Sequence, residues 1–175
     1  MSIAVGIDPS LTCSGLALID VATGDVTTRR VRTDPDGSSL RARRDRIRRA
    51  IAGILAPIPA RVGVTVIETP SHREQYGAQN ERAALFWWLV DQMCARGPVV
   101  EAAPPQRAKL ATGNGHASKG DVVAAIRAAH PDVHVPDDNV ADALALADAG
   151  AHWLGAPRPY RPAQAVAFAR LDWPS

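Results

Sequence analysis

Apolar and polar positions alternate in short blocks along the first part of the chain. Residues 3–8, 14–19 and 25–32 are runs rich in apolar and β-branched side chains, and turn-forming residues at 20–25 separate the last two. Short runs of this kind, bounded by turn residues, predict three consecutive strands joined as a hairpin-like meander.

The apolar positions then change to a helical spacing. They fall at Leu40, Ile47, Ile51 and Leu55, before a proline-containing turn. This spacing predicts a helix that begins at a serine N-cap, Ser38 or Ser39, and covers one face of the sheet. Residues 62–68 are again apolar and β-branched, which predicts a buried parallel strand reached through that helix.

The second half continues the alternation of helices and strands. Apolar spacing predicts helices over 79–95, 121–129 and about 136–154, a short strand at 99–100 and a short helix opened by Pro104-Pro105. This order of elements predicts an α/β fold with a mixed five-stranded sheet flanked by helices. We expect one domain over 1–155, followed by a proline-rich C-terminal tail over 156–175.

Three carboxylates stand where such a fold would gather them. Asp8 ends the first predicted strand, Glu68 ends the fourth, and Asp142 lies in an Ala/Leu-rich helix. A charge at the end of a buried strand is costly unless it has a partner. Oxygen ligands without a matching His or Cys cluster favour Mg²⁺ or Mn²⁺. Taken singly, each acid also fits a turn, a solvent-facing strand end or an exposed helix face.

The positive charges are unevenly distributed along the chain. The chain has 175 residues and a formal net charge of +2, but nine arginines fall between Arg29 and Arg49, and its only lysines are Lys109 and Lys119. The arginine cluster fits either a polyphosphate backbone or a solvated helix face. Cys13 and Cys94 match no zinc or redox spacing, and neither a signal peptide nor a membrane span is evident, so we expect a cytoplasmic protein with reduced thiols.

Four motifs, taken in order, resemble the RuvC family of Holliday-junction resolvases. They are Gly6-Ile-Asp8-Pro-Ser, Val66-Ile-Glu68, the segment Lys109–Lys119, and Ala141-Asp142-Ala-Leu-Ala. The resemblance implies an RNase H-like fold, a homodimer, and metal-dependent nicking of two strands of a four-way DNA junction, leaving 5′-phosphate ends, in DNA recombination and repair. It also implies that Asp8, Glu68 and Asp142 are catalytic and bind two Mg²⁺ or Mn²⁺ ions. Departures from the usual bacterial pattern are in line with a phage or prophage version.

One departure concerns the fourth metal ligand. The family commonly has an acid or a histidine three residues before the last aspartate, where this chain has Asn139. Asn139 shares a helix face with Asp142 and its amide oxygen can ligate a hard cation, but it adds no charge. Asp138 is the alternative ligand, although it is also a candidate N-cap of that helix.

Further residues are candidates for contact with DNA. The Lys109–Lys119 segment resembles the family's DNA-contacting loop, in which Lys119 would stabilise charge on the scissile phosphate and Lys109 would contact phosphate. His116 is either a proton donor or polar surface. Arg73 and Tyr76 follow Glu68 in a segment that approaches the junction centre in the family, and Tyr76 would stack either on bases or under the next helix.

Two other functions remain open. A chain weakened at Asn139 would bind junction DNA without cutting it efficiently. An aspartate after a first strand, followed by a hairpin, also opens sugar kinases and actin-like ATPases, but those folds need a second lobe that 175 residues leave no room for. Of the neighbouring Trp87 and Trp88, at most one is expected to face the core, and the other is a candidate for a dimer interface.

Overall fold

A single mixed sheet organises the molecule. The computed structural model describes residues 2–70, 78–157 and 159–174. The strands of the sheet lie in the order β3-β2-β1-β4-β5; they are β1 (Ile3–Asp8), β2 (Cys13–Asp20), β3 (Val26–Arg32), β4 (Val64–Glu68) and β5 (Val99–Ala102). The first three strands pair antiparallel, whereas β4 pairs parallel with both β1 and β5. The prediction of a mixed five-stranded sheet is confirmed.

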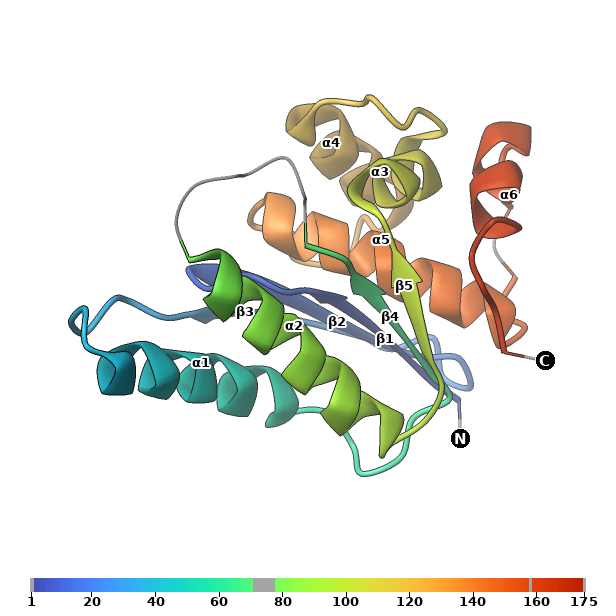
Figure 1. Cartoon of the computed structure of the whole chain (residues 1–175). Helices are drawn as coiled ribbons and strands as arrows, with labels where there is room; N and C mark the ends of the chain where they lie inside the picture. Colours follow the sequence, from blue (N-terminus) through green and yellow to red (C-terminus); the bar gives the residue numbers. More distant parts are fainter. Residues whose placement is uncertain (1, 71–77, 158, 175) are drawn as a thin grey trace.

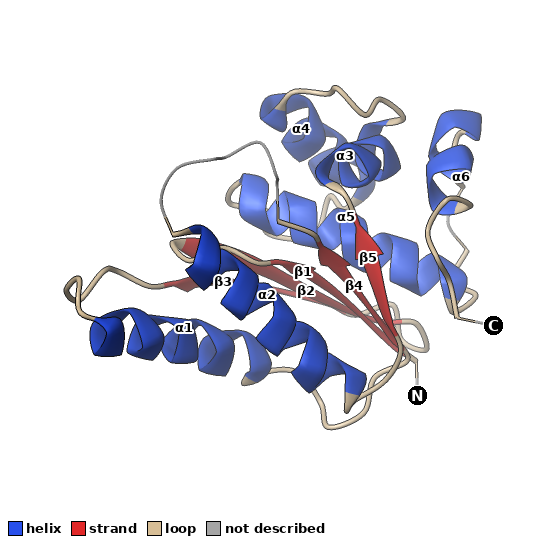
Figure 2. Cartoon of the chain, viewed as in Figure 1, coloured by secondary structure: helices blue, strands red, loops and turns tan. Residues whose placement is uncertain are grey.

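Helices cover both faces of this sheet (Figures 1 and 2). Helices α1 (Leu40–Leu55) and α2 (Gln79–Cys94) lie together over one face, and α5 (Asp138–Trp153) crosses the other. Helices α3 (Pro104–Thr112) and α4 (Lys119–Ala129) pack on α5, and α6 (Pro162–Phe168) packs on α3. In the described part of the chain, no helix is both long and apolar enough to cross a membrane.

Alternation along β1 separates two hydrophobic cores. Val5 and Ile7 point toward α1 and α2, and Ala4 points toward α5. Side chains on a strand alternate between faces, so Asp8 emerges on the same side as Ala4, at the end of the strand beneath α5. The sequence pattern of β1 therefore directs its only acid to the α5 side of the sheet.

Helix α5 lies close against the sheet because two strand residues are glycines. A Cβ atom on Gly6 would come within 1.9 Å of the Ala143 carbonyl oxygen, and one on Gly15 within 1.9 Å of the Asn139 carbonyl oxygen. The helix is buried from Val140 to Ala151 and is rich in alanine along that stretch. Small side chains on both surfaces thus bring the backbone of α5 down onto β1 and β2, which sets the depth at which Asp142 meets Asp8.

This close approach predicts a large stability effect of adding a single methyl group. Gly6→Ala or Gly15→Ala should lower the free energy of unfolding by about 3 kcal/mol or more, at the upper end for overpacking, because rigid backbone has to move. Gly120 of α4 is exposed, with no atom closer than 3.7 Å to its hypothetical Cβ, so Gly120→Ala should be neutral or stabilising. Urea denaturation measures all three, and equal stability of the Gly6 and Gly120 variants would contradict the packing argument.

The described structure refines three of the predicted segments. Lys109 lies within α3, since that helix continues to Thr112 and leaves only 113–118 as the connecting loop. The N-cap of α5 is Asp137, whose side chain accepts a hydrogen bond from the amide of Val140, and not Asp138. Helix α6 forms within the segment predicted as a tail, and the Gln164 side chain donates hydrogen bonds to the carbonyls of Leu110 and Ala111 at the end of α3.

Candidate active site

Asp8, Glu68 and Asp142 approach one another at the carboxyl ends of β1 and β4. These strands are parallel neighbours, with Ile7 opposite Ile67, so Asp8 and Glu68 leave adjacent strands at the same level. Asp142 comes from α5, which crosses both strands. The three acids are remote in sequence. They come from three elements that meet at the carboxyl ends of the inner strands β1 and β4.

Arginine 107 joins two of these acids, and the sequence analysis did not identify it. Its Nε donates a hydrogen bond to Glu68 Oε2 at 2.7 Å, and its Nη1 lies 2.8 Å from Asp142 Oδ1. The side chains of Arg107 and Glu68 are each 12% exposed and that of Asp142 is 7% exposed. The guanidinium is therefore a largely buried bridge between β4 and α5. The Asp142 contact is an ion pair without hydrogen-bond geometry, because Oδ1 is buried and accepts no hydrogen bond from any described residue.

Burial and mutual repulsion shift the titration of this cluster. Burial raises the pKa of Asp8 well above its ordinary value, and the negative charges of Glu68 and Asp142 raise it further. Burial also raises the pKa of Asp142, to about 7, while the charge of Arg107 opposes the rise and that of Glu68 adds to it. Burial alone would lower the pKa of Arg107, but its hydrogen bond to Glu68 and the surrounding carboxylates raise it overall. The cluster holds more negative charge than one arginine compensates.

The raised pKa of Asp142 predicts how stability depends on pH without metal. The folded state keeps the Asp142 proton up to about pH 7, whereas the unfolded chain loses it near 3.8, so this contribution is present at low pH and is lost as pH rises between those values. Three pKa units correspond to about 4 kcal/mol. In EDTA, the unfolding free energy of the wild type relative to Asp142→Asn should therefore fall across that window. A difference that stays constant from pH 4.5 to 8 would contradict this assignment.

Lys119 approaches the acids from α4. It is the first residue of that helix, where Ser118 accepts a hydrogen bond from the amide of Asp121 as the N-cap. Its ammonium pairs with Asp138, and that hydrogen bond raises the pKa of Lys119, as do the more distant charges of Asp142 and Asp8. The same contact lowers the pKa of Asp138. Lys119 remains 80% exposed, so its amine is accessible from solvent beside the acids.

The position of the predicted fourth ligand is also defined. Asn139 lies in the first turn of α5, three residues before Asp142 and therefore on a similar face of the helix. Its carbonyl lies over Gly15, which fixes its backbone above β2. Asp138, the alternative, is held by Lys119 instead. Whether Asn139 acts as a ligand stays a prediction.

The other candidate DNA-contacting residues lie around this centre. Lys109 follows Arg107 by two positions in α3, and residues two apart on a helix point in different directions, so the two cations do not face the same way. His116 is exposed in the turn between α3 and α4, where its amide donates a hydrogen bond to Asn114 Oδ1. Arg73 and Tyr76 lie outside the residues that the structure describes.

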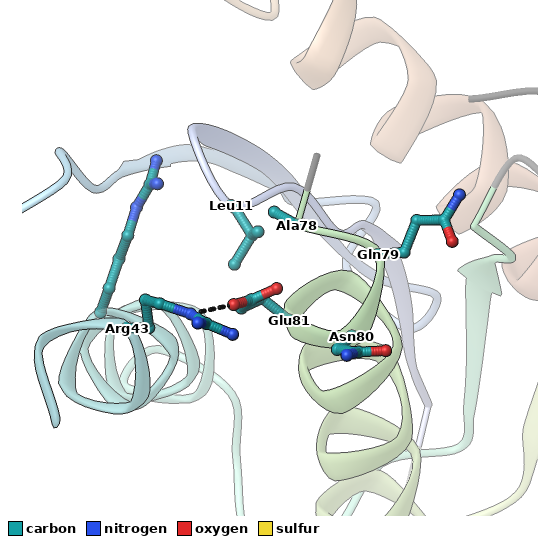
Figure 3. Close-up of a pocket in the computed structure, with 7 residues that line it drawn as sticks. Leu11, Arg43, Ala78, Gln79, Asn80 and Glu81 are labelled. Atoms are coloured by element: carbon teal, nitrogen blue, oxygen red, sulfur yellow. Dashed lines mark hydrogen bonds and ion pairs between the residues drawn. The ribbon is translucent and has the colours of Figure 1, made fainter. Parts of the chain in front are cut away.

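Two clefts flank the start of α2. The first has a volume of about 260 Å³ and is lined by Asp8, Glu68, Arg82 and the residues that follow each strand. The second, of about 510 Å³, lies between α1 and α2 and is bordered by an ion pair between Arg43 and Glu81 (Figure 3). Of the three clustered acids, Asp8 and Glu68 line the first cleft, and none lines the second. The first cleft is therefore the candidate reaction site, and Arg82 is the arginine in its lining.

The acid cluster has the donors for a divalent cation, although not yet their arrangement. Its donors are oxygens only, the set that suits Mg²⁺ or Mn²⁺, and the buried Asp142 Oδ1 accepts no hydrogen bond from the residues that the structure describes. Among the described residues, however, no three acidic, histidine or cysteine side chains converge on one point as a metal site does. Arg107 bridges two of the three acids. The residues therefore fit a divalent ion once Glu68 and Asp142 exchange Arg107 for it.

The strand order and helix placement define an RNase H-like α/β fold. Three strands form an antiparallel meander, a helical crossover returns to a parallel fourth strand, and a final helix crosses the opposite face with an acid aimed at the end of the first strand. The acids lie at the strand ends where the sheet meets that helix. The topology thus places the chain among α/β proteins with an RNase H-like fold.

Comparison with solved structures finds this fold in RuvC structures. A structure of Thermus thermophilus RuvC is 24% identical to this chain, covering 87% of this chain and 93% of that chain with a TM-score of 0.60. A second, T. thermophilus RuvC in complex with Holliday junction substrate, is 23% identical over 91% and 100% of the two chains, with a TM-score of 0.57. Neither a family model nor a curated protein matches the sequence. The predicted RuvC-like fold is confirmed.

Proposed function

We propose that this chain is a metal-dependent endonuclease of the RuvC family that resolves four-way DNA junctions by paired nicks. The observation that carries the proposal is the approach of Asp8, Glu68 and Asp142 at one edge of a RuvC-like fold. The likeness extends over most of both chains and includes a RuvC solved with a Holliday junction. A cluster of one buried and two partly buried acids is costly to a fold unless cations neutralise it.

The acids and nearby cations have distinct roles in this proposal. Asp8, Glu68 and Asp142 would hold Mg²⁺ or Mn²⁺, with Asn139 as a neutral fourth ligand; two such ions stabilise both the attacking and the leaving oxygen of a phosphodiester. Lys119 would bind a non-bridging oxygen of the scissile phosphate, since its exposed ammonium lies beside the acids. Asp138 keeps that ammonium in place before DNA arrives.

A basic surface next to the acids suits the DNA backbone. Across the sheet, Asp8 pairs with Gly15, and Gly15 pairs with Arg30 of the edge strand β3. Arg30 therefore stands on the same face and level as Asp8, and it forms an ion pair with Asp137, the N-cap of α5, at 3.0 Å. Arg32 follows two residues later and is exposed. We propose that these arginines contact phosphates that flank the cut site, together with Lys109 and His116 from the α3–α4 region.

Paired nicking requires two active sites, and α2 offers a surface for a homodimer. Trp87 is 65% exposed and Trp88 is 40% exposed on this helix, although large aromatic side chains are normally buried at least in part. Phe86, the preceding residue, is buried and contacts Trp87 edge to face. We propose that the two tryptophans enter the dimer interface, where aromatic residues are enriched.

Replacing Trp87 with Ala should weaken dimerisation by about tenfold or more, as expected for an aromatic side chain central to an interface. Sedimentation equilibrium across a concentration series measures the effect. Val166→Ala, which removes an exposed apolar side chain from α6, is the control and should leave association unchanged. A monomeric wild type, or equal association of the wild type and the Trp87 variant, would contradict this placement of the interface.

One observation favours a second function. Asn139 supplies no charge where the family commonly has an acid or histidine. Arg107 forms ion pairs with two of the three acids, Glu68 and Asp142. A junction-binding protein with weakened catalysis would show both features. A cleavage assay separates the two functions, since binding without cutting is the expected result for this alternative.

The test of the proposed function is digestion of a synthetic four-way junction in Mg²⁺ or Mn²⁺, beside a fork, a flap and a linear duplex of the same sequence. The proposal predicts symmetric nicks in two strands of the junction, with ends that ligase can reseal because they carry 5′-phosphate. Junction binding without nicks in either metal would support the weakened alternative. Equal cutting of the linear duplex would remove the assigned specificity.

A further inference from the structure

We propose that Arg107 is an internal counter-cation that competes with divalent ions for the acid cluster, and so sets how tightly the site binds metal before DNA is present. This inference rests on the proposed function for the identity of the ion. It concerns a residue that neither the motifs nor the strand-end pattern singles out. The geometry that supports it is the bridge from α3 to both Glu68 and Asp142.

The first argument is occupancy. Arg107 Nε lies 2.7 Å from Glu68 Oε2 and Nη1 lies 2.8 Å from Asp142 Oδ1, with all three side chains largely buried. A carboxylate that accepts a charge-assisted hydrogen bond, as Glu68 does, or that is held in an ion pair, as Asp142 is, is less free to ligate a metal. The same two side chains therefore cannot bind the guanidinium fully and also close around an ion.

The second argument is charge. The three carboxylates carry three formal negative charges when ionised, and Arg107 offsets one of them, while Lys119 and Asp138 offset each other. One divalent ion would neutralise what remains with Arg107 in place. A second ion would leave the site strongly positive unless Arg107 leaves or a phosphate arrives. We therefore infer that the DNA-free protein has enough negative charge for one ion, which binds in competition with Arg107, and that a second ion binds only together with DNA.

The third argument is that Arg107 has an alternative partner. It projects from α3, and the loop that follows this helix leads directly to Lys119 at the start of α4. A phosphate placed against Lys119 lies beside the acids, so a displaced guanidinium could form the paired hydrogen bonds that arginine makes with phosphate. Release from the carboxylates would thereby become a contact with substrate.

The test is binding of Mn²⁺ without DNA, measured by calorimetry and by the loss of free-ion signal in electron paramagnetic resonance. Arg107→Gln removes the charge and should bind Mn²⁺ about tenfold more tightly than the wild type or better, a change of about 1.4 kcal/mol. The variant should also melt at a lower temperature in EDTA, and Mn²⁺ should raise its melting temperature by more than it raises that of the wild type.

Arg127→Gln is the matched control. Arg127 is an exposed arginine of α4 whose guanidinium donates two hydrogen bonds to the carbonyl of Val135, so its loss removes an arginine charge and its hydrogen bonds without touching the acids. Its Mn²⁺ affinity should equal that of the wild type. If Arg107→Gln does not fold, Arg107→Lys replaces it. One ammonium cannot bridge two carboxylates as a guanidinium does, so this variant should show a smaller gain in affinity.

Unchanged or weaker Mn²⁺ binding by the Arg107 variants would overturn the inference; weaker binding would mean that Arg107 orients the ligands. This outcome differs from failure of the proposed function. If the variant gains affinity but the wild type never nicks a junction, the counter-cation stands and the nuclease does not. If the wild type nicks junctions but the variant gains nothing, only the counter-cation fails.

Discussion

Asp8→Asn should abolish junction nicking while leaving junction binding within about twofold of the wild type. Asp8 lies at the end of β1 on the α5 side of the sheet, beside Glu68 at the end of the parallel strand β4. Loss of an anionic ligand removes several kcal/mol of transition-state charge stabilisation, and about 4 kcal/mol corresponds to roughly a thousandfold in rate. Single-turnover cleavage and gel-shift titration measure the two quantities separately.

The control is the same substitution, aspartate to asparagine, at the opposite end of the strands. Asp20 ends β2 opposite Ile3, where it accepts hydrogen bonds from Ser2 and Ala22. Asp20→Asn makes the same change of carboxylate to amide at a strand end, far from Glu68. It should retain full nicking activity. A residual rate for Asp8→Asn within tenfold of the wild type would show that Asp8 is not a ligand.

Lys119→Met should lower the nicking rate by about a hundredfold or more, the usual cost of removing one group that stabilises developing charge. The charges of Asp142 and Asp8 contribute to the raised pKa of its ammonium, after the larger effect of the hydrogen bond to Asp138. The substitution should cost little stability, because an exposed pair such as that of Lys119 with Asp138 contributes about 0–1 kcal/mol. A large loss of activity would therefore not reflect unfolding.

Lys109→Met provides the comparison. Lys109 lies on the last turn of α3 and does not face the same way as Arg107, so its loss should weaken DNA binding modestly and leave the single-turnover rate within about threefold. The contrast distinguishes a lysine at the reaction centre from a lysine that contacts the backbone. Equal rate losses in both variants would contradict the separate roles assigned to them.

Much of this site could be anticipated because it follows from strand periodicity. The apolar runs that end at Asp8 and Glu68 predict buried strands, and a helical crossover makes them parallel neighbours, which places both acids at one edge. Asp142 is predictable in the same way, from an Ala-rich helix whose small residues permit close packing on a sheet. Each inference uses a short-range pattern together with one rule of topology.

Arg107 could not be found by the same reasoning. It belongs to none of the four motifs. The arginine pattern of the sequence instead indicates the cluster of nine arginines between Arg29 and Arg49 as the basic surface. Its significance depends on tertiary packing of α3 against α5. A topological signal was nevertheless present: α3 directly follows β5, whose Ala102 pairs with Glu68, so a cation early in α3 begins next to that acid.

The structure differs from the sequence-based predictions at two other places, the N-cap of α5 and the segment that forms α6, and both differences have local causes. Asp137 and Asp138 are adjacent acids before the same helix, and either can accept the amide hydrogen bond of an N-cap, so only the backbone geometry decides that Asp137 does so. Helix α6 lies in a proline-rich stretch that suggested a tail, but Pro162 stands at its first position, where proline favours a helix. The prediction of the domain boundary near residue 155 stays a prediction.

The most direct test of the central claim is to locate Mn²⁺ by anomalous scattering in crystals of the protein. The account predicts at least one peak among the carboxylates of Asp8, Glu68 and Asp142, within about 2.0–2.6 Å of their oxygens, with Arg107 displaced from at least one of its partners. Peaks confined to other sites, with the guanidinium still bridging Glu68 and Asp142, would contradict it.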